Sequence, residues 1–175
     1  ASMKQLAKEN NAYQAYIDSD PVAQGIMSQE ELNKAVEDHA SRVKDAAKQQ
    51  QEIVRDQRAA LDDMISEMRE GGKSFAEIFG SDEYRKQLQE IGNAAAEAAR
   101  LEAQASGTSR KQALADMGVT EESLGNMTGA KRELMAERVN ARTAAYEAKA
   151  AEEARQEAMK GTDERHRKAA EAEEK

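Results

Sequence analysis

The longest regular pattern of apolar and polar positions covers residues 28–70, where apolar residues recur every three or four positions. Ser28 and Glu31 at its start form a capping box, in which both side chains accept hydrogen bonds from free backbone amides. Gly71 and Gly72 end this block. The stripe comprises Leu32, Val36, His39, Val43, Ala46, Gln50, Ile53, Gln57, Leu61, Met64 and Met68. This pattern predicts one long helix whose stripe faces a partner helix.

The spacing within this stripe changes once. Steps of four and three alternate as far as Ile53, and two steps of four then lead through Gln57 to Leu61. Such a change predicts a stutter, a local break in coiled-coil packing. Gln50 and Gln57 allow two interpretations: they fix the register of an internal helix pair, or they line a groove that is open to another helix.

The middle of the chain is divided by glycines into short segments. Ser74 and Glu77 form a second capping box, which begins a single apolar turn over residues 74–80. This turn contains Phe75, Ile78 and Phe79. Those side chains either plug the end of a bundle or form an apolar tip for a partner. Residues 82–106 predict a helix whose apolar stripe narrows to alanine, which suits an antiparallel return close to the first long helix.

A second long helix is predicted over residues 129–160. Its large apolar side chains become sparse after Tyr146, and Gly161 is expected to separate off residues 161–175 as a solvated helical or disordered tail. Residues 1–160 would then form a single elongated domain. A short helix is expected over residues 3–18, after which Pro21 restarts the chain.

Composition favours long helices over a globular core. Of the 68 hydrophobic residues 34 are alanine, whereas Leu, Ile, Val and Phe together number 22. Ala, Glu, Lys, Leu and Arg make up 92 of the 175 residues, which is typical of long helices and coiled coils. The expected fold class is therefore all-α: an elongated antiparallel helical bundle of about three long helices, with short helices at 74–80 and 109–127.

Charge and residue types exclude several classes of function. The net charge of −8 argues against a general surface for nucleic acids or anionic membranes. No apolar run reaches the roughly 18 residues that a membrane span needs. The absence of cysteine removes thiolate catalysis, disulfides and cysteine-ligated metals.

Few residues suggest catalysis or metal binding. The two histidines are His39, which is expected to be a packed or register-setting residue of the long stripe, and His166. Asp163 and His166 share one helix face, as metal ligands sometimes do, but arginines flank the histidine and no second ligand pair is visible. No catalytic, cofactor-binding or metal-binding residue is therefore predicted.

Residues 113–120 resemble the turn of a helix-turn-helix DNA-binding motif, with a small residue before a turn glycine and a capping residue after it. The sequence departs from that pattern because Ala115 is one residue too close to Gly118. The following helix also begins with Glu121 and Glu122, which phosphates repel.

The function expected from the sequence is a non-enzymatic structural or adaptor protein that binds other proteins, or a second copy of itself, through helix faces. A cysteine-free helical rod with a thin core suits an accessory subunit of a bacterial secretion apparatus or of a phage particle. The candidate partner-binding residues are Phe75, Ile78, Phe79, Gln50, Gln57, Leu61, Met64 and Met68. The alternative is a nucleic-acid-binding regulator that uses residues 109–127.

Overall fold

The computed structural model describes residues 17–18, 22 and 24–174, and every regular element within these ranges is an α-helix. The helices are α2 (Gln29–Glu70), α3 (Phe75–Phe79), α4 (Asp82–Ser106), α5 (Thr108–Asp116), α6 (Glu121–Gly125) and α7 (Gly129–Glu174). Pro21 and nearly all of the helix predicted over residues 3–18 lie outside the described residues.

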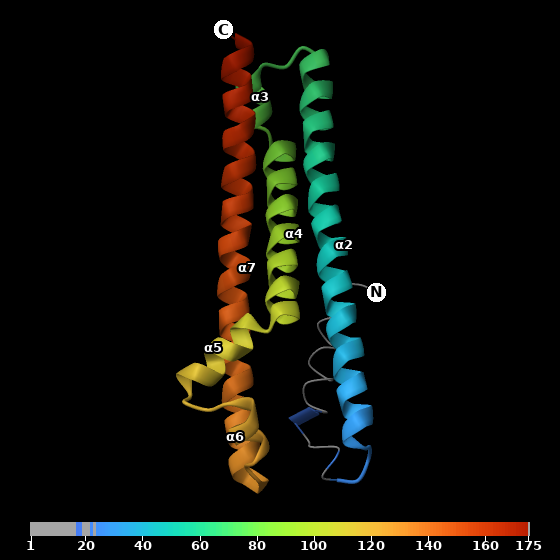
Figure 1. Ribbon diagram of the computed structural model, residues 1–175. Coiled ribbons are helices and arrows are strands. Elements are labelled where there is room, and N and C mark those ends of the chain that lie inside the picture. Colours follow the sequence, from blue (N-terminus) through green and yellow to red (C-terminus); the bar gives the residue numbers. More distant parts are fainter. Residues whose placement is uncertain (1–16, 19–21, 23, 175) are drawn as a thin grey trace.

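The three long helices form an extended antiparallel bundle, so the predicted fold class is confirmed. As Figure 1 shows, α4 runs opposite to both α2 and α7 and lies alongside each of them. The main helix contacts are those of α4 with α2 and of α4 with α7. At one end α3 joins α2 to α4, and at the other end α5 and α6 pack on α7. None of the described helices has a stretch long and apolar enough to cross a membrane.

Helix α2 keeps one unbroken register along its packed face. It begins at Ser28, whose hydroxyl accepts a hydrogen bond from the Glu31 amide, and it ends before Gly72, which has a φ of +92°. Its buried residues are Val43, Ala47, Gln50, Val54 and Leu61. With half-buried Gln57 and Met64, these positions alternate steps of four and three throughout.

The predicted stutter is therefore wrong. Val54 is 4% exposed and faces the core, whereas the neighbouring Ile53 is 42% exposed. Both residues are β-branched and apolar, so periodicity did not separate them. Once Ala47 and Val54 replace Ala46 and Ile53 on the stripe, no step of four follows another between Val43 and Met64.

Small residues allow α4 and α7 to approach closely. A Cβ atom built on Gly92 would lie 2.6 Å from Cγ of Met159, which is closer than real Cβ contacts. Ala94 and Ala98 are also buried along α4. The sequence predicted a close approach to the first long helix, whereas the tight contact at Gly92 is with α7.

Helix α7 does not stop at Gly161. It continues as a single helix to Glu174, and its buried residues there are Thr162, His166 and Ala170. The prediction of a solvated tail over residues 161–175 is corrected for the described residues, because one face of this segment packs on the bundle. Thr, His and Ala form that face, and they do not stand out in a search for large apolar residues.

Candidate functional site

Most of the predicted partner-binding residues lie in the core of the single chain. Phe75 and Ile78 are buried, and Leu61 and Ile78 belong to one cluster against which Met64, Met68 and Phe79 pack. The rings of Phe75 and Phe79 are stacked with centroids 5.9 Å apart. Guanidinium groups cover both rings, that of Arg69 over Phe75 at 4.1 Å and that of Arg167 over Phe79 at 5.0 Å.

Of the two interpretations of this turn, the structure therefore favours the end plug over the apolar tip. The two glutamines of the long stripe are also internal. Gln50 is buried, and its Nε2 donates a hydrogen bond to the carbonyl of Ala94 at 3.2 Å, so it ties α2 to α4. Gln57 is half-buried, and its Oε1 atom has no hydrogen-bond partner.

A chain of hydrogen bonds joins the three long helices next to the end plug. His166 on α7 contacts Oδ1 of Asp62 on α2 through Nε2 at 2.7 Å. Its Nδ1 contacts the hydroxyl of Tyr84 on α4 at 3.2 Å. The same hydroxyl donates to Oδ1 of Asp163 at 2.8 Å. The pair of residues in which the sequence suggested metal ligands is therefore joined through Tyr84, and the described residues hold no group of three or more possible ligands.

This chain has three links, so its completion requires three hydrogens. The carboxylates of Asp62 and Asp163 only accept, and the Tyr84 hydroxyl supplies one hydrogen. His166 must supply the other two, one from each ring nitrogen. The ring of His166 thus lies between the Asp62 carboxylate and the Tyr84 hydroxyl, and the residue is only 8% exposed.

The environment of Tyr84 also affects its own ionisation. Burial raises the pKa of the Tyr84 phenol far above its usual value, and the hydrogen bond to Asp163 raises it further. Tyr84 is 1% exposed, so its ring fills the core while its hydroxyl holds the polar chain. We call Asp62, Tyr84, Asp163 and His166 the polar fastener, because their hydrogen bonds join α2, α4 and α7.

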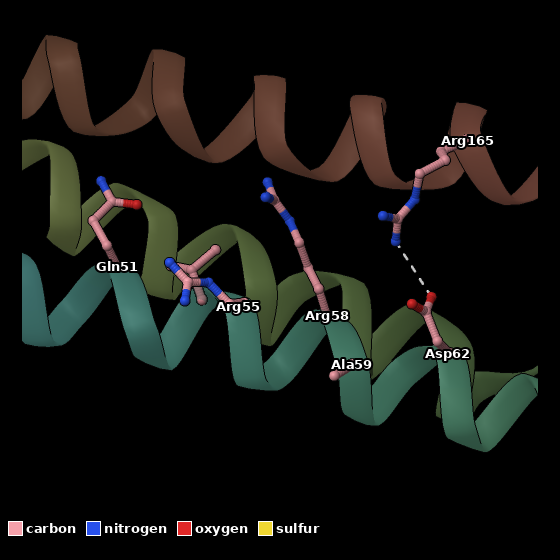
Figure 2. A pocket seen from close by; sticks show the side chains of 7 residues that line it. Gln51, Arg55, Arg58, Ala59, Asp62 and Arg165 are labelled. Carbon is pink, nitrogen blue, oxygen red and sulfur yellow. Dashed lines mark hydrogen bonds and ion pairs between the residues drawn. The ribbon is translucent and has the colours of Figure 1, made fainter.

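Beside this fastener is a basic groove between α2 and α7, shown in Figure 2. The groove has a volume of about 430 Å³. Its lining residues are Gln51, Val54, Arg55, Arg58, Ala59, Asp62 and Arg165. We call it the arginine groove. Figure 2 shows the side chains of Arg58 on α2 and Arg165 on α7 extending into the space between the two helices.

The arginine groove holds more positive than negative charge. Its one carboxylate, Asp62, is shared by Arg165 at 3.3 Å and by His166 at 2.7 Å through the same oxygen atom. Among the described residues, no ion pair or hydrogen bond is formed by Arg55 or Arg58, and the Nε of Arg58 is buried without an acceptor. Neither of these two guanidinium groups therefore has an ion-pair partner in the described part of the chain.

The segment that resembles a helix-turn-helix packs against α7. Helices α5 and α6 share a cluster with α7 that contains Ala113, Leu114, Leu124 and Val139. Arg110 on α5 makes an ion pair with Glu121, the first residue of α6. Helix α6 has only five residues and begins with two glutamates, so the position of a recognition helix is short and acidic.

Comparisons with known proteins give no assignment: no protein-family model, curated protein or solved structure matches this chain.

The arginine groove was not predicted from the sequence. Arg55 and Arg58 are three apart on one helix, which places them on neighbouring faces, but this spacing is common on solvated helices. Arg165 comes from a helix about 100 residues later in the chain. Only the packing of both α2 and α7 against α4 places the three arginines along one groove.

Proposed function

We propose that this protein is a non-enzymatic structural or adaptor subunit that binds another helical protein through the N-terminal third of α2. The observation that carries the proposal is the exposure of residues 29–42. None of their side chains is buried, and Val36 is 43% exposed. The same stripe is buried from Val43 onward.

The unequal lengths of the helices explain this exposure. Helix α4 has 25 residues, whereas α2 has 42 and α7 has 46. The C-terminal end of α4 packs on α2 around Val43, where Leu101 joins Val43 and Ala47 in one cluster. The first turns of α2 therefore extend past the end of α4.

The exposed part of α2 has the features of a helix-docking surface. It is amphipathic, and Leu32, Val36 and His39 continue the apolar stripe of the buried part. A partner helix that packed on this stripe would extend the interhelical seam of the bundle. Such a partner would bury Val36, which is 43% exposed, and would cover the half-buried Leu32 further.

The protein class that fits these features is an accessory subunit of a bacterial secretion apparatus or of a phage particle. The core supports this choice because it is thin. The largest fully buried side chains are Tyr84, Leu61, Ile78, Ile91, Leu101 and Val139. Such a bundle opens at low cost, which favours passage through a channel or late assembly. A midpoint of thermal unfolding above about 90 °C for the isolated chain would count against this class.

Site-specific photo-crosslinking in cells tests the docking surface. A photoreactive amino acid at Val36 should give one discrete adduct, and the same amino acid at exposed Ser41 on the other face should not. Val36→Glu, with the probe moved to Leu32, should remove the adduct because a buried charge opposes docking. An adduct of twice the chain mass would identify the partner as a second copy. Equal labelling from both positions, or none from either, would reject the proposal.

A nucleic-acid-binding regulator that uses residues 109–127 is the alternative function, and the geometry supports it less. The charge of Arg110 is paired with Glu121, and α6 presents acidic residues in its first turn. A salt-dependent shift of duplex DNA at micromolar protein would support this alternative, and no shift at low salt would remove it.

A further inference from the structure

We propose that the arginine groove is a binding site for a doubly charged oxyanion of the phosphate type. The proposal does not depend on the partner surface of α2, because the groove lies farther along the helix, between Gln51 and Asp62. Its basis is the charge, the geometry and the unmet hydrogen-bonding capacity of its lining residues.

Charge balance indicates the valence of the ligand. Asp62 accepts from both Arg165 and His166, so it has little capacity left to compensate other cations. Arg55 and Arg58 contribute two further positive charges to the groove. A dianion would balance these two charges. The chain as a whole has a net charge of −8, so this local excess of positive charge departs from the rest of the molecule.

The hydrogen-bond donors indicate the shape of the ligand. A guanidinium group presents its N–H donors in a planar fork, which suits the oxygens of phosphate or carboxylate groups. Arg58 extends from α2 toward α7, and Arg165 extends from α7, so donors approach the groove from two sides. The Nε–H of Arg58 is buried without an acceptor, and an unmet donor of this kind costs stability unless a ligand satisfies it.

The groove also has room for such a group. Its volume of about 430 Å³ far exceeds that of a phosphate ion, and it is open to solvent. A free phosphate and the phosphoryl group of a larger molecule can both enter.

Thermal unfolding in matched salts tests the site on the intact chain. Replacing chloride with phosphate at constant ionic strength should raise the Tm by about 3 °C or more at tens of millimolar phosphate, because the anion binds only the folded state. The variant Arg58→Met should lose this increase. Arg42→Met is the matched control, since Arg42 is exposed on α2 and does not line the groove, and it should keep the increase.

A second variant keeps the test decisive if Arg58→Met folds poorly. Ala59→Glu places a carboxylate in the groove lining, four residues from Arg55. It should raise the Tm in chloride and abolish the response to phosphate, because the internal carboxylate occupies the same donors.

Phenyl phosphate distinguishes the two sources of the ligand: a larger Tm shift than with phosphate indicates a phosphomonoester, and a smaller one indicates the free ion. No response in the wild type, or equal responses in wild type and Arg58→Met, would overturn the proposal.

Discussion

At the scale of single residues, Tyr84 joins the polar cluster to the apolar core. Its hydroxyl contacts both Asp163 and His166, and its ring lies beside Phe79 with centroids 5.2 Å apart. Tyr84→Phe keeps the ring and removes both polar contacts. We expect a loss of about 1–3 kcal/mol in the free energy of unfolding, because the Nδ1 of His166 is left without a partner in a buried site.

Tyr146→Phe is the matched control for this variant. The Tyr146 hydroxyl donates to Asp116, but that contact is exposed. Its removal should change the free energy of unfolding by less than about 0.5 kcal/mol. Urea unfolding of both variants measures the difference in free energy of unfolding. Equal losses would show that the buried contacts of Tyr84 stabilise the fold no more than the exposed contact of Tyr146.

The pH dependence of stability should carry opposite contributions from two glutamates. Burial raises the pKa of Glu147, although a hydrogen bond from Gln104 opposes the shift. The folded chain therefore holds this proton more tightly than the unfolded chain does. As pH rises through the unfolded value of about 4.3, the ionised carboxylate begins to cost stability. Glu147→Gln should raise the Tm at pH 7, and this gain should shrink as pH falls toward about 4 and be absent below that value.

Glu152 gives the opposite sign. Hydrogen bonds from Arg155 and Gln156 lower its pKa to about 2, so its contribution is present above the unfolded value and is lost as pH falls toward 2. Glu152→Gln should leave the Tm at pH 7 unchanged or slightly lower, because the pair is exposed and screened by solvent. A gain at pH 7 from both variants would contradict the assigned causes.

At the scale of elements, the register of α2 predicts different losses of stability from substitutions at the adjacent residues Val54 and Ile53. Val54→Ala should lower the free energy of unfolding by roughly 1.5–3 kcal/mol, because it leaves a cavity on the packed face of α2. Ile53→Ala should cost less than about 0.5 kcal/mol, since Ile53 faces solvent. A larger loss from Ile53→Ala would show that Ile53 lies on the packed face, as the stutter predicted from the spacing requires.

The continuity of α7 is tested at Gly161. This glycine lies inside the helix, where a methyl group would meet open space. Gly161→Ala should therefore raise the free energy of unfolding by about 0.5–1 kcal/mol through the higher helix propensity of alanine. Destabilisation by this variant would indicate that the helix breaks here, as the sequence suggested.

The elements of this chain were more predictable than their faces. The capping residues Ser28 and Ser74 are local signals, and they mark the helix starts that the structure has. The packed face of α2 was ambiguous because Ala46 and Ala47, and then Ile53 and Val54, offer two adjacent apolar phases. The polar fastener and the arginine groove depend on helices that pack side by side after long separations in sequence, which periodicity does not reveal.

At the scale of the whole molecule, the bundle should be extended as an isolated chain. Helix α2 alone spans about 63 Å at 1.5 Å per residue, given its 42 residues. A compact chain of this length would have a radius of gyration of about 16 Å. Small-angle scattering should give a value above about 20 Å for a species of 19.2 kDa, and a value near 16 Å would contradict the arrangement in Figure 1.

The central claim is that α4 holds α2 only from Val43 onward and leaves residues 29–42 for a partner. Hydrogen–deuterium exchange of the isolated chain tests this claim most directly. Amides in residues 33–42 should exchange roughly tenfold faster or more than those in residues 50–66, because a helical segment without buried side chains opens locally at low cost. Uniform protection along α2 would contradict the claim, since it would show that the first third of the helix is already packed.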